Sequence, residues 1–291
     1  MNSNGSTLKA KTQASEIWAC RRDLPPFTEL EQMFRLSEFD NILNADTLNL
    51  LKNKVNPDCH FDFVCQSDLG EIELYYEDVI FTHSQIPTRA NSWHDLFNGL
   101  IWLQFPKTKA LLNRWHMEDI QLHGLTPRTQ RRNQITHFDE CGVIVVCDEQ
   151  ARVDALREHQ FKSILFEKRQ RWDKDIQAMV FGHANYEMLL QPYIGLTGKW
   201  LHIKPCNGYF EMSKLQQLQY IDKVLCQQLI DNGAFCNSCR LSPLPLLGIP
   251  GWWPENEQSQ FYDNVDYFRP KPNKKTKILK SQLSVCREQI E

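Results

Sequence analysis

Apolar residues at helical spacing dominate the pattern of hydrophobic and polar positions along the chain. Behind Asn44, a residue type that often caps helices, leucines and a valine recur at three- and four-residue intervals up to Val55. The same periodicity runs from Ser92 to about Glu140, with interruptions at two prolines. We therefore expect helices over residues 28–36, 44–55, 92–140 (broken at Pro106 and Pro127), 150–171 and 213–230, with one more starting at Gly182.

Shorter segments have the patterns of strands. Phe61–Cys65 and Glu71–Tyr76 alternate between apolar and polar residues, and Asp68-Leu69-Gly70 lies between them like a hairpin turn. Gly142–Val146 is wholly apolar, and further strands are expected at residues 176–181 and 200–203. From Leu241 the chain is rich in Pro and Gly, which argues against a regular element, while its apolar content predicts a segment that wraps the core.

These elements predict an α+β fold, a helix-rich single domain with a small mixed sheet and a Pro/Gly-rich C-terminal wrap. With 291 residues, 42% of them hydrophobic and 11% aromatic, the chain can build a sizeable core. Residues 1–22 are polar and are expected to form a flexible arm, residues 23–270 the domain, and the lysine-rich residues 271–291 a basic tail.

Charge and composition exclude some classes of function. The net charge of −3 argues against nucleic acid as the main partner. No run reaches the roughly 18 apolar residues of a membrane span, and the start has no apolar signal region. The 10 cysteines are scattered, so reduced thiols and a cytoplasmic location are expected.

The helix that begins at Ser92 carries the first candidate site. Its apolar side chains form one wide face, while His94, Asp95 and Asn98 share the remaining arc. A solvated arc normally carries Lys, Glu or Arg, and none occurs from Ser92 to Gln104. The arc is therefore either a solvent-facing or merely hydrogen-bonded surface, or a functional site with His94 and Asp95 as catalytic candidates. Asn91 and Asn98 are candidate binding residues.

The second candidate is the pair of His183 and Glu187, which lie four residues apart and so share one face of a helix. Such a pair suits a carboxylate-oriented general base or two metal ligands, and it also occurs as an ordinary His–Glu contact. Two ligands do not make a metal site. Further groups could come from His116, or from Asp139 and Glu140 just before the Gly142 strand.

Other signals are weaker. Cys236 and Cys239 form a lone CxxC without a second pair at zinc-ribbon spacing. Arg132 belongs to a cluster of arginines that is more typical of a solvated helix face than of an anion site, although we keep Arg132 as a candidate binding residue. There is no nucleophile elbow, phosphate loop or dinucleotide fingerprint, so the cofactor and the identity of any metal stay open.

Five ordered segments give the chain a family resemblance. They are NSWHDLFNGLIWLQFPKTKALLN, THFDECGVIVV, LFEKRQRW, VFGHANYEMLLQPYIGLT and PLPLLGIPGWWPEN…FYDNVDYFRP. Together they resemble a bacterial family known as a domain of unknown function, number 3025, over roughly residues 25–270. The resemblance implies one family domain and carries no established activity, cofactor or catalytic residue. The family pattern usually has Asp where this chain has Asn133.

Two hypotheses of different classes follow. In the first, His94, Asp95, His183 and Glu187 surround one pocket of an enzyme, with Asp139 or Glu140 as a further carboxylate, and the chemistry is hydrolytic or metal-assisted. In the second, the same residues stabilise the fold of a binding protein, and the aromatic segment Leu244–Phe268 or the basic tail contacts a partner. Whether the side chains of His94 and His183 meet decides between them.

Overall fold

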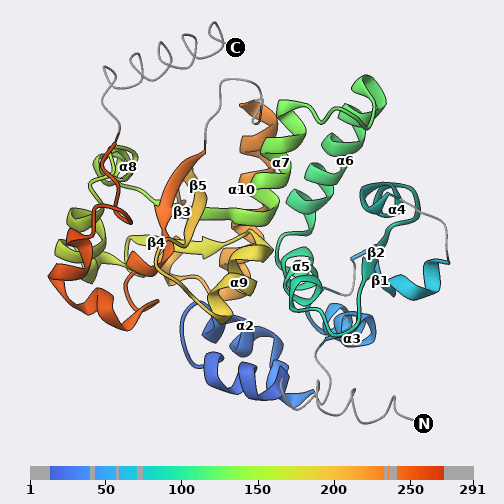
Figure 1. The fold of residues 1–291 in the computed structure, drawn as a ribbon, viewed down its shortest axis with the longest axis horizontal. Coiled ribbons are helices and arrows are strands. Elements are labelled where there is room, and N and C mark those ends of the chain that lie inside the picture. The colour runs from blue at the N-terminus through green and yellow to red at the C-terminus, as the bar shows by residue number, and fades with distance from the viewer. Residues whose placement is uncertain are drawn as a thin grey trace, which may run out of the picture.

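A four-stranded mixed sheet forms the centre of the molecule (Figure 1). The computed structural model describes residues 14–39, 43–56, 59–70, 75–232, 235 and 241–271. The strand order is β4 (Ile176–Val180), β3 (Gly142–Cys147), β5 (Thr197–Ile203) and β6 (Ser242–Pro245). β3 runs antiparallel to β4 and parallel to β5, and β6 is antiparallel to β5. All six residues of β3 are buried, as its wholly apolar sequence predicts for a central strand.

Helices pack beside this sheet and against one another (Figure 1). They are α5 (Trp93–Gln104), α6 (Pro106–His123), α7 (Gln130–Cys141), α9 (His183–Leu190) and α10 (Lys214–Asp231). α5 contacts α9, and α7 contacts both α6 and α9. The helical block predicted from Ser92 is confirmed, with Pro106 at the first position of α6, where its missing N–H costs nothing.

The expected hairpin after Phe61 is wrong. β1 (Asp62–Cys65) pairs in parallel with β2 (Gln85–Thr88), and the chain crosses between them through α4 (Tyr76–His83). Residues 71–74 of the expected second strand lie outside the described residues, and Tyr76 already begins α4. Glu77 and Asp78 favour a helix start here, because acidic side chains are stabilised by the helix dipole in the first turn.

The N-terminal part of the described chain is packed rather than free. Residues 14–21 are helical, and Trp18 is 2% exposed. The Trp18 indole donates to Glu31 Oε2 at 2.8 Å and stacks on Trp93. This stretch was expected to belong to the flexible arm, but Ala14, Ile17 and Trp18 pack against the core. α2 (Phe27–Phe34) follows, one residue ahead of the predicted cap at Thr28, and α3 (Ala45–Val55) has the predicted Asn44 cap.

The C-terminal segment wraps the core as predicted, with one correction. Leu244, Leu246 and Leu247 are fully buried, and 3-10 turns follow at Leu246–Gly248, Pro254–Glu257 and Ser259–Asp263. Ser242–Pro245, which the Pro content argued against as a regular element, is the strand β6. An edge strand tolerates proline because one side of its backbone needs no partner.

The stretch predicted as a helix from Gln150 to Arg171 is divided. It consists of α8 (Gln150–Arg157), a π-helical segment at Lys162–Glu167 and a 3-10 turn at Arg169–Arg171. The chain therefore has a helix-rich α+β fold with small mixed sheets. None of the helices in the described part of the chain combines the length and apolarity that crossing a lipid bilayer demands.

Gly182 lies where α7 and β3 come closest to the start of α9. Its backbone N–H donates to the Gly142 carbonyl at 2.8 Å. A Cβ at this position would stand 2.3 Å from the Glu140 carbonyl oxygen and 2.3 Å from the Gly142 nitrogen. These atoms belong to the backbone, which cannot rotate away. Only glycine therefore allows α9 to start directly beside the end of α7.

We predict that Gly182→Ala lowers the free energy of unfolding by about 3 kcal/mol or more, because the methyl group forces two backbone segments apart. Urea denaturation measures the loss. Gly208→Ala is the control, since its Cβ would meet only Glu211 Oε2 at 3.8 Å, an ordinary contact, and only its left-handed conformation with φ +79° opposes the change; that costs about 1 kcal/mol. Equal losses in the two variants would contradict the close approach.

Candidate metal centre

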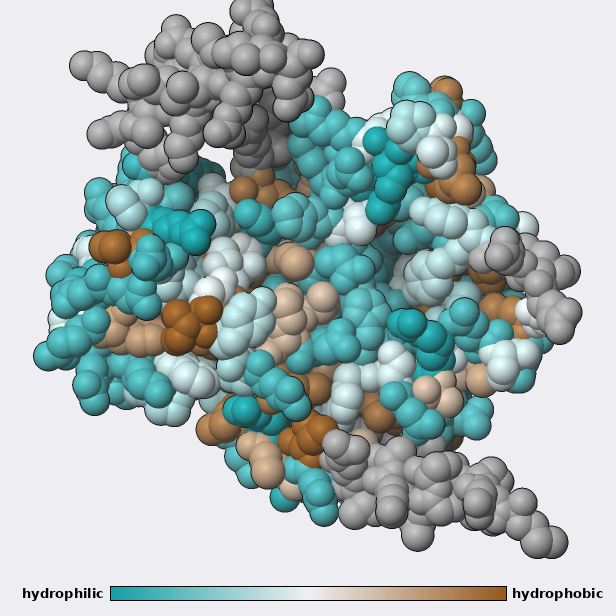
Figure 2. Space-filling model, in the orientation of Figure 1, coloured by the Kyte–Doolittle hydropathy of each residue, from teal (hydrophilic) through white to brown (hydrophobic). Residues whose placement is uncertain are grey.

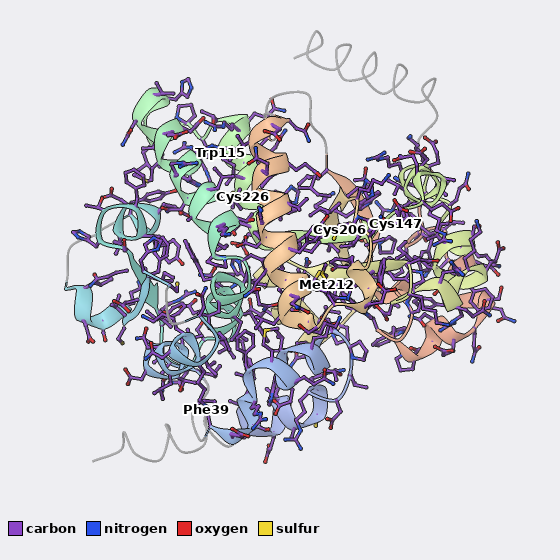
Figure 3. All side chains as sticks on the ribbon, turned by 180° about the vertical axis from the view of Figure 1, so that it is seen from behind. Phe39, Trp115, Cys147, Cys206, Met212 and Cys226 are labelled. Atoms are coloured by element: carbon purple, nitrogen blue, oxygen red, sulfur yellow. The ribbon has the colours of Figure 1, made fainter. Side chains whose placement is uncertain are left out.

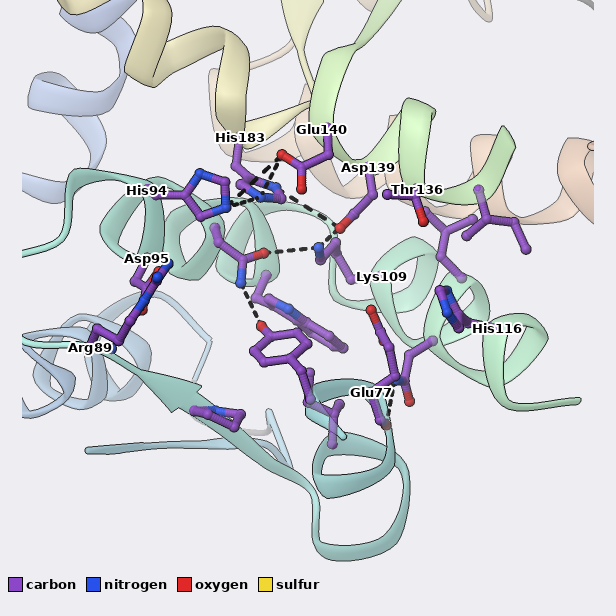
Figure 4. A pocket seen from close by; sticks show the side chains of 18 of the residues that line it. Glu77, Arg89, His94, Asp95, Lys109, His116, Thr136, Asp139, Glu140 and His183 are labelled. Atoms are coloured by element: carbon purple, nitrogen blue, oxygen red, sulfur yellow. Dashed lines mark hydrogen bonds and ion pairs between the residues drawn. The ribbon is translucent and has the colours of Figure 1, made fainter. Parts of the chain in front are cut away.

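A polar cavity of about 340 Å³ opens between α4, α5, α6, α7 and the start of α9. Hydrophilic residues dominate the surface of this face of the molecule (Figure 2). Figure 4 shows that His94, His183 and Glu140 gather at one side of the cavity, with Glu77 and His116 at the other and Lys109 between them. The volume is in the range of small-molecule sites, and the polar lining suits a small polar ligand.

Three ligand atoms from three helices meet in this cavity. His94 Nε2 lies 3.0 Å from His183 Nε2. Glu140 Oε2 is 3.2 Å from His183 Nε2 and 4.0 Å from His94 Nε2. The structure therefore brings together His94, His183 and Glu140, which the sequence placed on separate elements.

The fold explains the convergence. β3 and β4 are antiparallel neighbours in which Val143 pairs with Val180. Glu140 stands three residues before Val143 and His183 three residues after Val180, so the register places them at the same edge of the sheet. α5 contributes His94 from its first turn, since the helix begins behind the Ser92 cap, whose Oγ accepts from the Asp95 N–H at 3.2 Å.

A further carboxylate fixes the tautomer of His94. His94 Nδ1 lies 2.9 Å from Glu187 Oε2, and a carboxylate only accepts hydrogen bonds, so Nδ1 carries the proton. His183 Nδ1 lies 3.9 Å from Asp139 Oδ2, beyond hydrogen-bond distance, and has no hydrogen-bond partner among the described residues. When its only ring proton is on Nδ1, His94 points the lone pair of Nε2 at His183 Nε2, 3.0 Å away.

Burial keeps His183 neutral. Its side chain is 5% exposed, and the loss of solvation lowers its pKa to about 3, although the charge of Asp139 acts in the opposite direction. Burial also raises the pKa of the Glu140 carboxyl, and the charges of Asp139 and Glu187 add to this effect. The Nε2 lone pair of His94, His183 Nε2 and the Glu140 carboxyl group thus face each other, an arrangement that a bound cation would stabilise.

A metal ion fits between these three atoms. A point equidistant from atoms separated by 3.0, 3.2 and 4.0 Å lies about 2.0 Å from each, which matches Zn–N and Zn–O bonds of about 2.0–2.2 Å. A proton on one imidazole Nε2 would form a hydrogen bond to one of the other two atoms, and the remaining atom would still lack a partner. Glu187 behind His94 forms the carboxylate–histidine arrangement that orients metal-bound imidazoles.

A chain of buried polar groups adjoins the cluster. Lys109 Nζ donates to Asp139 Oδ1 at 2.5 Å and to Asn98 Oδ1 at 2.9 Å, and Asn98 Nδ2 donates to Tyr76 Oη at 2.7 Å (Figure 4). Burial acts to raise the pKa of Asp139, but the charge and hydrogen bond of Lys109, together with the nearby His183 and His116, outweigh it, so the net pKa is lowered. Asp139 and Lys109 therefore form an ion pair beside His183.

The other sequence candidates lie elsewhere or have a different partner. Asp95 lines the cavity, but it is held by Arg89 through an ion pair of 2.7 Å and by the Arg89 backbone N–H at 2.6 Å. Burial acts to raise the pKa of the Asp95 carboxyl group. The hydrogen bonds and the charge of Arg89 together outweigh this effect, so the net pKa is lowered. Asn91 is exposed in a left-handed turn with φ 58°. Neither geometry suits a catalytic group.

Arg132 was predicted to lie on a solvated helix face, and this is wrong. Its side chain is 0% exposed, with Nε 3.4 Å from Asp119 Oδ2 and a donated hydrogen bond to the Leu125 carbonyl. It holds the turn between α6 and α7 and does not line the cavity. Asn133 is exposed on α7, so the departure from the family pattern at this position does not touch the cavity.

Sequence reasoning missed Lys109, Glu77 and Tyr76. All three line the cavity. A lysine in a helix is normally solvated, and nothing in the local pattern of α6 marks Lys109 as buried. The sequence held one indirect indication of Lys109. Buried Asp139 and Asn98 would each need a cation or a hydrogen-bond donor as a partner.

None of the cysteines in the described part of the chain takes part in the cluster. Those in the described residues are free, and Figure 3 shows Cys147, Cys206 and Cys226 at separate places. Cys236 and Cys239 lie outside the described residues.

Comparison with known proteins identifies the family to which the chain belongs. A model of the family described as "Protein of unknown function (DUF3025)" matches residues 61–272, more than half of the chain. The chain belongs to this family. The match confirms the resemblance in the sequence and leaves the activity open. Searches of curated proteins and of solved structures find no match.

His116, at the other side of the cavity in this DUF3025 protein, provides a test of the burial. It is 3% exposed, and its Nε2 lies 2.7 Å from Tyr75 Oη. Burial lowers its pKa to about 4, and the charges of Arg128 and Arg132 add to the effect. The imidazole is therefore neutral at pH 7.

We predict that His116 makes the protein less stable as the pH falls. Between about 6.5 and 4 the unfolded chain binds a proton that folded His116 does not, so stability is fully present above pH 6.5 and is lost towards pH 4. The free energy of unfolding that is lost over this pH range is on the order of 2 kcal/mol after screening by cavity water. Urea denaturation of chelator-treated protein should show His116→Gln losing less stability than the wild type. The curve of the exposed His123→Gln control should run parallel to the wild type; a parallel curve for His116→Gln would contradict the prediction.

Proposed function

We propose that this protein is a metal-dependent hydrolase whose ion is bound by His94, His183 and Glu140. The observation that carries the proposal is the convergence of two imidazole nitrogens and a carboxylate oxygen around a point about 2.0 Å from each. Three protein ligands at the side of an open polar cavity are typical of catalytic rather than structural zinc, since structural sites use four.

The residues around the ion have distinct roles in this proposal. A divalent ion held here lowers the pKa of bound water and polarises a carbonyl group. Glu187 accepts from His94 Nδ1 and so directs Nε2 towards the ion. Lys109, held by Asp139 and Asn98, supplies a fixed positive charge beside the site where negative charge develops during attack on a carbonyl.

The alternative of a partner-binding protein receives less support. It assigned binding to the aromatic segment Leu244–Phe268 or to the basic tail. Tyr262, Tyr267 and Phe268 are buried, so they pack the core and offer no docking surface. The tail from residue 272 lies outside the described residues.

A cytoplasmic location is part of the proposal. The scattered spacing of the cysteines supports it, together with the free thiols found among the described residues.

Metal binding is tested by elemental analysis of protein that was incubated with Zn²⁺ and then exchanged into metal-free buffer. We expect one ion per chain in the wild type, and its loss in His94→Ala, His183→Ala and Glu140→Gln, because two remaining ligands hold zinc weakly. His116→Gln is the control, since it changes a histidine of the same cavity that is not a ligand. Circular dichroism shows whether each variant is folded.

Two results would contradict this proposal. If the folded variants of His94, His183 and Glu140 retain the ion, the proposed metal site is wrong. Iron as the bound metal of protein purified from cells would keep the site but contradict hydrolysis, because two histidines and a carboxylate also hold iron(II) in oxygenases.

Glu187 is predicted to strengthen the site without being a ligand. Glu187→Gln removes the charge behind His94 but leaves an oxygen that accepts from Nδ1. We expect zinc affinity to fall by about tenfold, the lower end of the range for such outer carboxylates. Competition with a zinc-binding dye measures the affinity. Glu118→Gln, an exposed acid paired with Arg114, should leave it unchanged, and an equal loss in both variants would rule out a specific role for Glu187.

A further inference from the structure

One carboxylate of the cavity has no cationic partner. The acidic side chains that line the cavity are Glu77, Asp95, Asp139 and Glu140. Arg89 pairs with Asp95, Lys109 pairs with Asp139, and Glu140 faces the proposed ion. Within the described ranges, no lysine, arginine or histidine lies at ion-pair distance from Glu77. Among the same residues, the hydrogen bond to its carboxylate is the one of 2.6 Å that Asn113 Nδ2 donates to Oε2.

The surroundings of Glu77 supply little compensation for its charge. His116, which also lines this part of the cavity, is neutral at pH 7 because burial lowers its pKa to about 4. The charges of Lys109 and, more weakly, of Arg128 act to lower the pKa of Glu77, but Lys109 is engaged by Asp139, and the exposed Arg128 donates to Thr136 Oγ1 at 2.5 Å. Burial raises the pKa of the Glu77 carboxyl. A buried carboxylate is costly without a positive partner, and a bound cation would restore the balance.

A second, independent group in the same cavity is also without a partner. Trp102 lines the cavity, is 1% exposed, and its indole Nε1 has no hydrogen-bond partner among the described residues. An indole N–H only donates, so it requires an acceptor such as a carbonyl oxygen. The Trp102 ring already has the Lys109 ammonium group 5.4 Å from its centroid, so the aromatic ring left for a substrate ammonium group is that of Tyr76.

We propose that the substrate is a small aminoacyl compound, with a protonated primary amine bound by Glu77 and a hydrolysable carbonyl group. This rests on the proposed hydrolytic function and names its substrate class. Glu77 supplies the negative charge for the ammonium group, and Trp102 donates to an oxygen of the same molecule. In the hydrolysis, the water oxygen bonds to the carbonyl carbon, the bond to the leaving amine breaks, and a proton from the water passes to that amine. No further reactant is required.

The experiment uses the full-length, zinc-loaded protein and two probes that differ in one charge, L-alaninamide and N-acetyl-L-alaninamide. Isothermal titration calorimetry measures their binding. We expect the amine to bind at least tenfold more tightly than its acetylated form. Glu77→Gln, which removes the charge at nearly constant shape, should lose that preference. Asp78→Asn is the matched control, because Asp78 lies on the same helix, accepts from Thr82 and does not line the cavity.

The outcomes separate this proposal from the metal site. His94→Ala protein should still prefer the amine, since Glu77 is not a ligand, so a failed metal site leaves the amine preference testable. Equal binding of the two probes by the wild type would overturn the proposal, whatever the variants do. A folded Glu77→Gln protein that keeps the preference would overturn it as well. Loss of zinc from Glu77→Gln would assign Glu77 to the metal site instead and would also overturn it.

Discussion

Val143 and Val180 are paired across β3 and β4, and the position of the candidate site depends on this pairing. It brings the end of α7 and the start of α9 to one edge of the sheet, where Gly182 allows backbone segments to approach within a distance that a Cβ would prevent. Glu140 and His183 consequently lie 3.2 Å apart. A shift of one residue in this register would turn the side chains of one strand to its other face and separate the two groups.

The protonation and charge of these groups determine what the cluster can bind. Glu187 holds a proton on Nδ1 of His94, so the Nε2 lone pair of His94 faces His183 Nε2 and the Glu140 carboxyl group. Burial makes it costly to relieve this by protonating His183. The fold therefore maintains a cluster of acceptors that favours a bound cation. Of the acidic groups that line the cavity, Asp95 pairs with Arg89 and Asp139 with Lys109, so only Glu77 and Glu140 have no lysine or arginine partner among the described residues.

The sequence predicted the elements better than their arrangement. Helical periodicity located α5, α6, α7 and α10, and the apolar run located β3, because these signals are local. The parallel pairing of β1 with β2 was missed, since the alternation of residues 71–76 is also compatible with a chain that enters a helix at Tyr76. Trp18 was missed as an anchor because the polar residues 1–13 led us to assign all of residues 1–22 to a flexible arm.

The candidate site could be predicted in part. The lack of Lys, Glu and Arg near His94, and the spacing of His183 and Glu187, indicated buried polar residues, and the structure brings them together with Asp139 and Glu140. Asp95 and Arg132 were indistinguishable from site residues in the sequence, although each forms a structural ion pair. Whether two polar residues meet depends on sheet register and helix packing, and a single sequence carries no direct signal for either.

The central claim is that an ion binds between His94, His183 and Glu140. Anomalous X-ray diffraction at the zinc absorption edge, from crystals of the zinc-loaded protein, tests it most directly. We predict one strong peak about 2.0–2.2 Å from His94 Nε2, His183 Nε2 and a Glu140 oxygen. A fully ordered cluster without a peak, or a peak only at another place such as the Cys236 and Cys239 pair, would contradict the claim.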